Sequence, residues 1–259
     1  MAEKEDAQVS KKKMFEEFIN KLHLNGEVEE AMIDVHEDTI SCNVFIQHKM
    51  FGIDIQFAGN FFNKQNIEVP IVNLETLYKL LKSFPDDSEV ELKGHSTNIN
   101  DNRLHNISLS TDILDSQFIL GKPRAIDNKI KVDTDKISDW LFDFNFTEFN
   151  EIYRKYQNIF KDYETFYFSN VDGKVYLNFG GMRKRTENSI TVELDIKLDS
   201  NAQQLFKESL LFNKDRFNAV LNSNREADIH VYVNNKMYMI ECKEENISCK
   251  YFNTKTKNQ

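Results

Sequence analysis

The chain has 259 residues, of which 40% are hydrophobic, and a formal net charge of -9 at pH 7. This length and the 21 Phe predict one large or two medium-sized domains with a sizeable core and argue against a disordered chain. With 8 Gly and no glycine-rich phosphate loop, the sequence also argues against the nucleotide-binding folds that need one.

In the first half, two amphipathic helices each precede a group of strands. From Ser10 onward, apolar residues recur at spacings of three and four, which predicts a helix that Gly26 ends. Asn73 is a suitable N-cap and begins the second helix. Runs rich in Ile, Val and Phe predict strands at residues 30–35, 39–48, 51–57, 89–93, 104–110 and 116–120.

A polar connector separates the two halves. Residues 121–133 (GKPRAIDNKIKVD) contain a Lys-Pro step, which disfavours a helix. We therefore expect an N-terminal domain over residues 1–120 and a C-terminal domain over residues 134–259.

The second half repeats this order. The apolar stripe from Phe146 to Phe160 predicts the clearest amphipathic helix of the chain, and a further helix is expected over residues 213–222. A hairpin turn is expected at Val171-Asp172-Gly173. Strands are predicted at residues 165–169, 174–179, 189–195, 227–233, 236–242 and 247–252.

Successive helices thus begin roughly 60 to 75 residues apart, which indicates an internal repeat. The pattern predicts an α+β protein of two tandem domains, each with two helices packed on antiparallel sheets. The alternative is an ordinary α+β protein whose elements happen to be evenly spaced.

Basic residues recur on all four predicted helices, although the chain as a whole is acidic. Lys and Arg bind phosphates without reading bases, so these positions are candidate contacts to the DNA backbone. The alternative is that they only solvate the outer helix faces, where Glu and Asp also occur. The candidates are Lys12, Lys13, Lys79, Lys82, Arg154, Lys155, Lys161, Lys214 and Arg216.

The cysteines and the N-terminus indicate the cellular compartment. Cys42, Cys242 and Cys249 lack the spacing of a zinc site or a disulfide framework, which is typical of a reducing compartment. The charged start MAEKEDAQVSKKK lacks the apolar region of a signal peptide, and no apolar run reaches the roughly 20 residues of a spanning helix. We expect a soluble, cytoplasmic protein that does not bind a membrane.

Three segments resemble the DNA sliding clamps, most closely the two-domain phage type, and the eukaryotic and archaeal clamps share this plan. Residues 149–181 (FNEIYRKYQNIFKDYETFYFSNVDGKVYLNFGG) are similar to the opening of a clamp's second domain. Residues 210–253 (LLFNKDRFNAVLNSNREADIHVYVNNKMYMIECKEENISCKYFN) are similar to the closing half of that domain. Residues 72–94 (VNLETLYKLLKSFPDDSEVELKG) are similar to the corresponding part of the first domain.

The resemblance implies a ring without an active site or cofactor. Clamp domains place their helices inside the ring and their sheets outside, and six domains close it, so two-domain chains form a homotrimer. Double-stranded DNA passes through the ring, a clamp loader opens it, and DNA polymerase docks near the connector. If the protein is viral, its compartment is the host-cell cytoplasm. By this resemblance the candidate partner-binding residues are Pro123, Ile126, Ile130, Tyr251 and Phe252.

Two other functions stay open. Asp228, Glu241 and Lys243 fit the D…ExK pattern of Mg²⁺-dependent nucleases, but only sixteen residues follow the pattern, where such folds need further elements. A single-stranded DNA-binding module would need aromatic side chains on exposed strands. We interpret Trp140 and Phe142 as core or interface residues, although the sequence does not show which aromatic residues are exposed.

Overall fold

Two compact units make up the chain. Unit 1 consists of Met1–Val44 and Ile55–Lys131, and unit 2 consists of Phe45–Asp54 and Val132–Gln259. The computed structural model describes residues 10–46, 50–93, 106–122, 126, 132–134, 137–146, 153–156, 158–159, 163–180 and 188–254. The division after Lys131 falls inside the predicted connector, residues 121–133, whereas the placement of Phe45–Asp54 in unit 2 follows from long-range contacts. The sequence-based bounds 1–120 and 134–259 stay a prediction.

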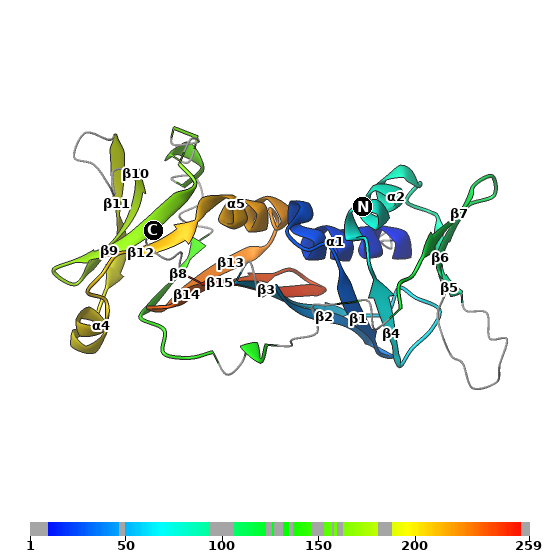
Figure 1. Cartoon of the computed structure of the whole chain (residues 1–259), viewed down its shortest axis with the longest axis horizontal. Helices are drawn as coiled ribbons and strands as arrows, with labels where there is room; N and C mark the ends of the chain where they lie inside the picture. Colours follow the sequence, from blue (N-terminus) through cyan, green and yellow to red (C-terminus); the bar gives the residue numbers. More distant parts are fainter. Residues whose placement is uncertain are drawn as a thin grey trace, which may run out of the picture. The chain divides into compact units, whose positions relative to one another are not determined.

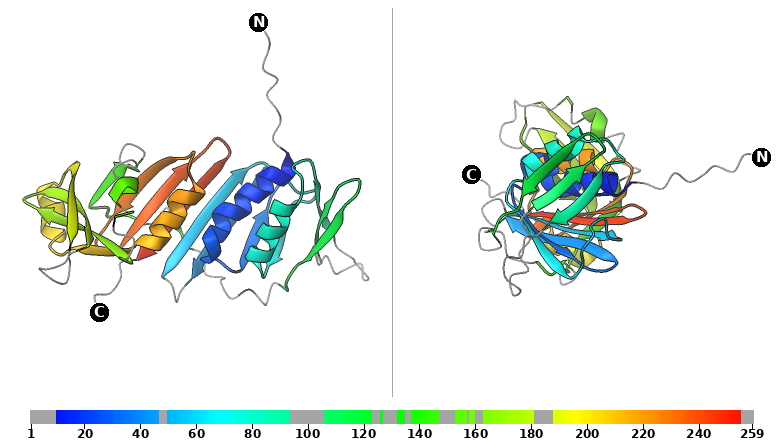
Figure 2. Two further views of the ribbon diagram at one scale, coloured as in Figure 1. Left: turned by 90° about the horizontal axis from the view of Figure 1, so that it is seen from above. Right: turned by 90° about the vertical axis from the view of Figure 1, so that its right-hand side faces the viewer.

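Unit 1 has two antiparallel sheets and two helices that lie side by side across one face of the larger sheet (Figures 1 and 2). Its strands follow the order β4-β1-β2-β3, and those of the smaller sheet follow β5-β6-β7. The helices are α1 (Lys11–His23) and α2 (Leu74–Ser83), with a 3-10 turn η1 (Leu24–Gly26) after α1. The strands are β1 (Ala31–Val35), β2 (Thr39–Ile46), β3 (Phe51–Ala58), β4 (Ile67–Ile71), β5 (Glu89–Lys93), β6 (Asn106–Ser110) and β7 (Asp115–Ile119).

Local sequence explains both helices of unit 1. The side chain of Ser10 accepts a hydrogen bond from the Lys13 N–H at 3.2 Å and caps α1, and Asn73 caps α2 through the Thr76 N–H at 2.9 Å. Leu24 adopts a left-handed conformation (φ 47°) that ends α1. The apolar stripes of both helices are buried, while β1 and β2 alternate between buried and partly exposed residues. Period-two burial of this kind is expected where one face of a sheet is covered by helices.

Unit 2 contains a four-stranded sheet of order β11-β10-β9-β12 and a second sheet in which β15, β14, β13 and β8 are consecutive neighbours. The segment Phe45–Asp54 lies beside β15, where the Thr254 N–H donates to the Met50 carbonyl at 3.1 Å. The strands are β8 (Phe142–Asn145), β9 (Thr165–Val171), β10 (Lys174–Gly180), β11 (Ser189–Lys197), β12 (Leu210–Asn213), β13 (Asp228–Val233), β14 (Met237–Lys243) and β15 (Ile247–Thr254). The helices with described bounds are α4 (Ser200–Leu205) and α5 (Lys214–Ser223).

Aromatic rings form the core of unit 2. The ring centroids of Phe166 and Phe217 are 4.9 Å apart, and those of Phe212 and Tyr238 are 4.7 Å apart. The hydroxyl of the buried Tyr153 donates a hydrogen bond to Asn218 Oδ1 at 2.7 Å. This bond fixes residues 153–156, which are helical, against α5.

The structure confirms most predicted elements and adds four. The hairpin turn is confirmed, because Asp172 and Gly173 both have positive φ (52° and 82°), as a tight turn between twisted strands requires. Of the helix predicted from residue 146 to 160, Phe146 and residues 153–156 are helical, and the remainder lies largely outside the described residues. The elements β4, β8, β12 and α4 were not predicted, because each has only four to six residues, too few for a periodic pattern to emerge.

Candidate nucleic-acid interface

Positive charge is concentrated on the helices. α1 carries four basic and two acidic side chains, and α2 and α5 each carry two basic and one acidic side chain. These three helices therefore have a net positive charge in a chain whose total is -9. Because net charge does not fix local charge, an acidic protein can still present a basic surface to DNA.

On α1, two adjacent lysines have opposite environments. Lys12 is only 2% exposed, and its Nζ lies 2.6 Å from Glu16 Oε2 and 3.2 Å from Asp86 Oδ1. Lys13 is exposed, as is Lys11. Since the Lys12 ammonium is already paired with two carboxylates, Lys13 and Lys11 are better placed to contact a phosphate.

On α2, both candidate lysines are exposed. The side chain of Lys79 is 72% exposed and its Nζ lies 2.6 Å from Glu75 Oε1, one helical turn away. The Lys82 ammonium lies 5.1 Å from the ring centroid of Tyr78 on the same helix. Exposed ion pairs and cation–π contacts of this kind contribute little interaction free energy, so both lysine ammonium groups remain able to bind an anion. Lys11, Lys13, Lys79 and Lys82 form what we call the unit-1 basic patch.

In unit 2, the candidate basic residues also divide into exposed and buried side chains. Arg154 and Lys155 are exposed, whereas Lys214 at the start of α5 is 3% exposed. Arg216 donates from Nη1 to Asn253 Oδ1 at 3.1 Å, and its guanidinium lies 5.8 Å from the ring centroid of Phe51. These contacts engage Arg216 in the packing of unit 2. The candidate Lys161 lies outside the described residues.

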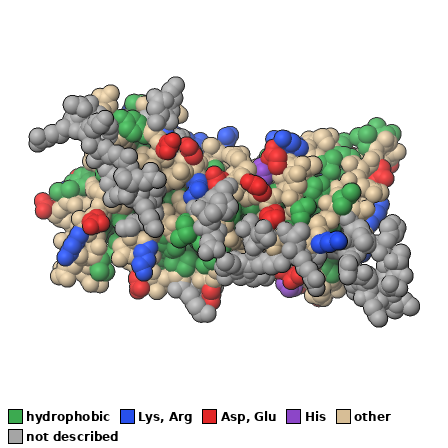
Figure 3. Space-filling view, viewed as in Figure 1, with side chains coloured by type: hydrophobic (Ala, Val, Ile, Leu, Met, Phe, Trp, Pro, Cys, Tyr) green, Lys and Arg blue, Asp and Glu red, His purple; other side chains and the backbone are tan. Residues whose placement is uncertain are grey.

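Arg225, just beyond α5, is exposed and was not among the predicted contacts, although its position at the end of a basic helix could have indicated it. Arg154, Lys155 and Arg225 form what we call the unit-2 basic patch. On the face drawn in Figure 3, basic and acidic side chains of the described residues are interspersed.

A buried histidine lies beside the unit-1 basic patch. His23 Nε2 is 2.8 Å from Glu75 Oε2, but the contact does not have hydrogen-bond geometry. Burial lowers the pKa of His23, the Glu75 carboxylate raises it, and Lys79 lowers it further. The pKa of Glu75 is lowered, chiefly by its hydrogen bond from Lys79. His23 therefore favours its neutral form in the folded chain.

Solved structures similar to this chain cover nearly its full length. The A. fulgidus PCNA solved with the C-terminal region of FEN-1 aligns with a TM-score of 0.68 at 12% identity, over 97% of this chain and 98% of that chain. The Entamoeba histolytica proliferating cellular nuclear antigen aligns with a TM-score of 0.62 at 14% identity, over 93% and 94% of the two chains. A chain of the PCNA2–PCNA3 complex from Sulfolobus tokodaii aligns with a TM-score of 0.63 at 14% identity, over 95% of this chain and 97% of that chain.

The fold is that of the PCNA-type sliding clamps. The predicted α+β clamp fold, with helices packed on antiparallel sheets, is confirmed. No protein-family model and no curated protein matches the chain, so the likeness is one of structure at 12% to 14% identity. The closer resemblance to phage clamps stays a prediction.

Three of the candidate partner-binding residues of this clamp fold are described, and all three are buried. Ile126 and Tyr251 are fully buried, and the Tyr251 hydroxyl accepts a hydrogen bond from Asn224 Nδ2 at 3.2 Å. Phe252 is 1% exposed and stacks on Phe45. Pro123 and Ile130 lie outside the described residues. In this conformation the described candidates support the core, and a peptide would reach them only after the surrounding side chains move.

The clamp fold does bring the D…ExK residues together. Asp228 on β13 is the register partner of Lys243 on β14, and Lys243 Nζ lies 3.0 Å from Glu241 Oε2. Glu241 also accepts a hydrogen bond from Tyr232 at 3.4 Å. Among the described residues, no group of three or more His, Cys, Asp or Glu side chains could hold a metal ion. We therefore do not extend the nuclease hypothesis to a proposal.

Within the described part of the chain, no helix has the length and apolar character that crossing a membrane requires.

Proposed function

We propose that this protein is a sliding clamp, a non-catalytic DNA polymerase processivity factor that encircles duplex DNA. The observation that carries the proposal is the clamp fold, which aligns over 97% of this chain and 98% of the A. fulgidus PCNA chain. In this mechanism retention is topological, because a closed ring cannot dissociate sideways from DNA. Weak phosphate contacts and no cofactor then suffice, and we propose a cytoplasmic location.

Two strand edges support ring closure. Among the described strands, β7 ends the smaller sheet of unit 1 and β11 ends the four-stranded sheet of unit 2. Exposed apolar side chains accompany the β7 edge, where Ile113 is 89% and Ile119 is 77% exposed. An edge strand presents unpaired backbone groups that another chain can satisfy. We propose that β7 of one copy pairs with β11 of the next.

Such a contact is heterologous, so it closes only when the rotation per copy completes a circle. With two units per chain, three copies would supply the six domains of a clamp ring. The Sulfolobus tokodaii structure is a complex of two different clamp chains. We propose that this chain instead forms a homotrimer with itself.

The basic patches provide the proposed contact to DNA. They lie on or beside helices, and we propose that these helix faces line the pore. Lys and Arg that contact only phosphates carry no sequence information, which suits a protein that must slide.

We propose partner binding by analogy with one of the similar solved structures. The A. fulgidus clamp was solved with the C-terminal region of FEN-1 bound to it. We propose that DNA polymerase uses a comparable short segment to bind this chain near the connector. A clamp loader would be needed to open the ring around DNA.

The first experiment is the solution mass by light scattering after size exclusion, over a dilution series. A species of three times the chain mass is expected, dissociating on dilution. A monomer at every concentration would remove the topological mechanism.

The proposed edges can be tested separately. Ile119→Asp on β7 and Val192→Asp on β11 should each give monomers, because a buried carboxylate would oppose edge pairing. Val171→Asp places the same charge on a 54% exposed residue at a hairpin turn and serves as the matched control. Mixing the two edge variants should restore dimers only, through the single intact β7–β11 contact. Trimers of either variant alone would contradict the assignment of its edge.

A further inference from the structure

One carboxylate of unit 1 lies between an exposed ammonium group and a buried imidazole. Glu75, in the first turn of α2, has its Oε1 atom 2.6 Å from Lys79 Nζ and its Oε2 atom 2.8 Å from His23 Nε2. The Lys79 side chain is 72% exposed and belongs to the unit-1 basic patch, whereas the His23 side chain is 4% exposed. His23 is the last residue of α1, which lies beside α2 (Figure 2). Lys79 and a protonated His23 would therefore compete for the same carboxylate.

The His23 Nε2 atom has an unused capacity for hydrogen bonding. It is buried, and within the described part of the chain no group forms a hydrogen bond with it, because the contact to Glu75 lacks the required geometry. A buried polar atom without a hydrogen bond is unfavourable. The Glu75 side chain is 49% exposed and so has space to turn. A proton on Nε2 would then convert the contact into a charge-assisted hydrogen bond.

Burial and a neighbouring charge both oppose protonation of His23. Burial lowers the pKa of His23, the Glu75 carboxylate raises it, and the Lys79 ammonium lowers it. Two further ionisable groups face His23: Tyr78 of α2, with a centroid distance of 5.7 Å, and Glu29, which lines the same cavity of about 430 Å³. The pKa of Glu75 is lowered, chiefly by its hydrogen bond from Lys79, so Glu75 stays ionised where His23 titrates. Lys79 is thus the opposing charge that an anionic ligand can draw away.

We propose that His23 is a proton-uptake site coupled to DNA binding, so that duplex binding strengthens as the pH falls. The inference rests on the proposed function, in which the unit-1 basic patch contacts phosphates. A phosphate that binds the Lys79 ammonium draws it away from Glu75. The released carboxylate turns to His23, which takes up one proton from the solvent at Nε2. Conversely, a protonated His23 holds Glu75 and leaves Lys79 available to the phosphate.

Binding and protonation favour each other by the same factor. DNA must therefore raise the pKa of His23 to the extent that protonation of His23 raises the affinity for DNA. Because an exposed ion pair such as Lys79–Glu75 contributes little, the expected gain in affinity is about threefold. The gain is absent well above the pKa of His23 in the complex, and it is complete once the DNA-free protein is also protonated.

NMR of the histidine side chains in the full-length protein measures this coupling directly. The imidazole signal of His23, assigned by its loss in His23→Gln, is titrated from about pH 7.5 to 5.5 with and without a short linear duplex. The duplex should raise the pKa of His23. An unchanged or lowered pKa in protein saturated with the duplex would overturn the inference.

Two lysine variants separate the relay through Glu75 from the general field of DNA. Lys79→Met removes the ammonium that is paired with Glu75, so the duplex should then change the pKa of His23 little. Lys82→Met is the matched control, because Lys82 is an exposed lysine of the same helix that lies over the Tyr78 ring, 5.1 Å from its centroid. In this control the duplex should raise the pKa of His23 as in the unchanged protein. Equal responses of the two variants would contradict the relay.

Duplex affinity, measured by fluorescence anisotropy at low and fixed ionic strength, gives the second readout. From about pH 7.5 to 6.0 the unchanged protein should gain about threefold more affinity than His23→Gln. Glu75→Gln, at an exposed position, should lose the same gain, whereas His36→Gln, at an exposed turn, should keep it. Equal gains in all four proteins would overturn the inference and leave the clamp proposal intact. A protein that does not bind the duplex at any pH would overturn both.

Discussion

Gly52 and Phe252 are in direct contact in unit 2. A Cβ atom added to Gly52 would lie 2.1 Å from Cζ and 2.3 Å from Cε2 of the Phe252 ring. That ring is 1% exposed and stacks on Phe45 with a centroid distance of 6.1 Å and an interplanar angle of 11°. The contact joins the segment Phe45–Asp54 to the last strand of the chain, and it leaves no space for a side chain at residue 52.

Gly52→Ala should therefore destabilise the protein by about 1–3 kcal/mol, because the new methyl group overpacks a buried ring. Urea unfolding followed by circular dichroism measures the free energy of unfolding. In a Phe252→Leu background the same substitution should be less costly, because the smaller side chain leaves room for the methyl group. A double-mutant cycle with no coupling between the two positions would contradict this assignment.

Reversing four exposed cations of the two basic patches should weaken retention on DNA without unfolding the protein. The changes are Lys79→Glu, Lys82→Glu, Arg154→Glu and Lys155→Glu. Each lost phosphate contact lowers affinity and reduces the salt dependence, so a loss of roughly tenfold or more is expected. Retention on linear duplex DNA, whose open ends let a ring slide off, is measured by gel filtration over a salt series and tests this result.

The matched control reverses four lysines outside the helices and so changes the net charge equally. Its positions are Lys64, Lys207, Lys236 and Lys250, which all lie on strands or loops. If both quadruple variants lose retention to the same extent, the effect reflects net charge, and the helix faces lose their assigned role.

Substitutions of Lys12 and of Lys13 should differ in their effects on protein stability and on DNA binding. Lys12→Met keeps the buried stem and removes the ammonium, whereas Lys12→Ala also removes the stem and should destabilise by about 1–3 kcal/mol. Lys13→Met, at an exposed position, should leave stability nearly unchanged and lower the salt dependence of DNA binding. A reduced salt dependence for Lys12→Met would show that the Lys12 ammonium leaves its carboxylates to bind phosphate.

His23 should make the protein less stable in mild acid. Its pKa is lowered from 6.5, first by burial, so the unfolded chain binds a proton more readily than the folded chain. The free energy of unfolding should therefore be highest above pH 6.5 and fall as the pH decreases from 6.5 toward the lowered pKa of the folded state. Denaturant unfolding at a series of pH values from about 7.5 to 5.5 spans the start of this window.

His23→Gln should flatten that pH dependence, since the titrating group is removed. His36→Gln is the control, because His36 is exposed. The window also lies above the range in which Glu75 titrates, since the pKa of Glu75 is lowered from 4.5. An equal flattening by both substitutions would rule out burial of His23 as the cause.

The elements that depend on local interactions could be predicted from the sequence alone. Ser10, Asn73 and Asn213 each cap a helix through their own side chains, and the apolar stripes that follow are long enough to show helical periodicity. The turn at Asp172 and Gly173 is likewise a local choice of backbone conformation. These signals were sufficient to predict an α+β protein of two tandem domains with helices packed on sheets, whereas the clamp fold was predicted from the resemblance of three segments to known clamps.

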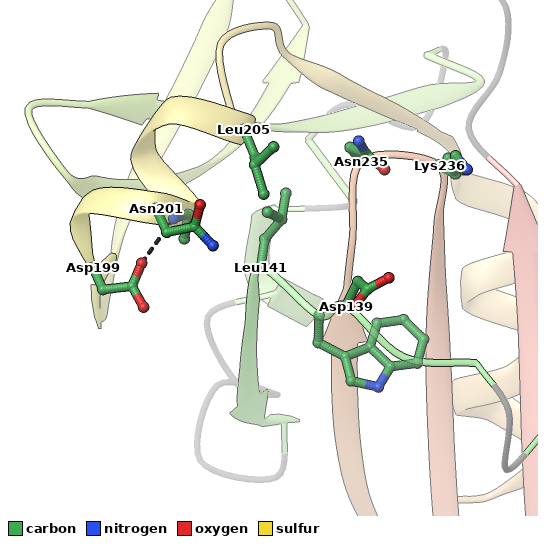
Figure 4. A pocket seen from close by; sticks show the side chains of 9 residues that line it. Asp139, Leu141, Asp199, Asn201, Leu205, Asn235 and Lys236 are labelled. Carbon is green, nitrogen blue, oxygen red and sulfur yellow. Dashed lines mark hydrogen bonds between the residues drawn. The ribbon is translucent and has the colours of Figure 1, made fainter.

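Which basic residues are available to a ligand, in contrast, depends on the packing of the folded chain. Lys12 and Lys13 are neighbours in sequence, but Lys12 is buried against Asp86, a residue 74 positions away, while Lys13 is exposed. In the same way, Leu141 and Leu205 line one cavity of unit 2 only because α4 folds against the segment before β8 (Figure 4). Such burial depends on contacts between distant segments, and the local sequence pattern does not contain them.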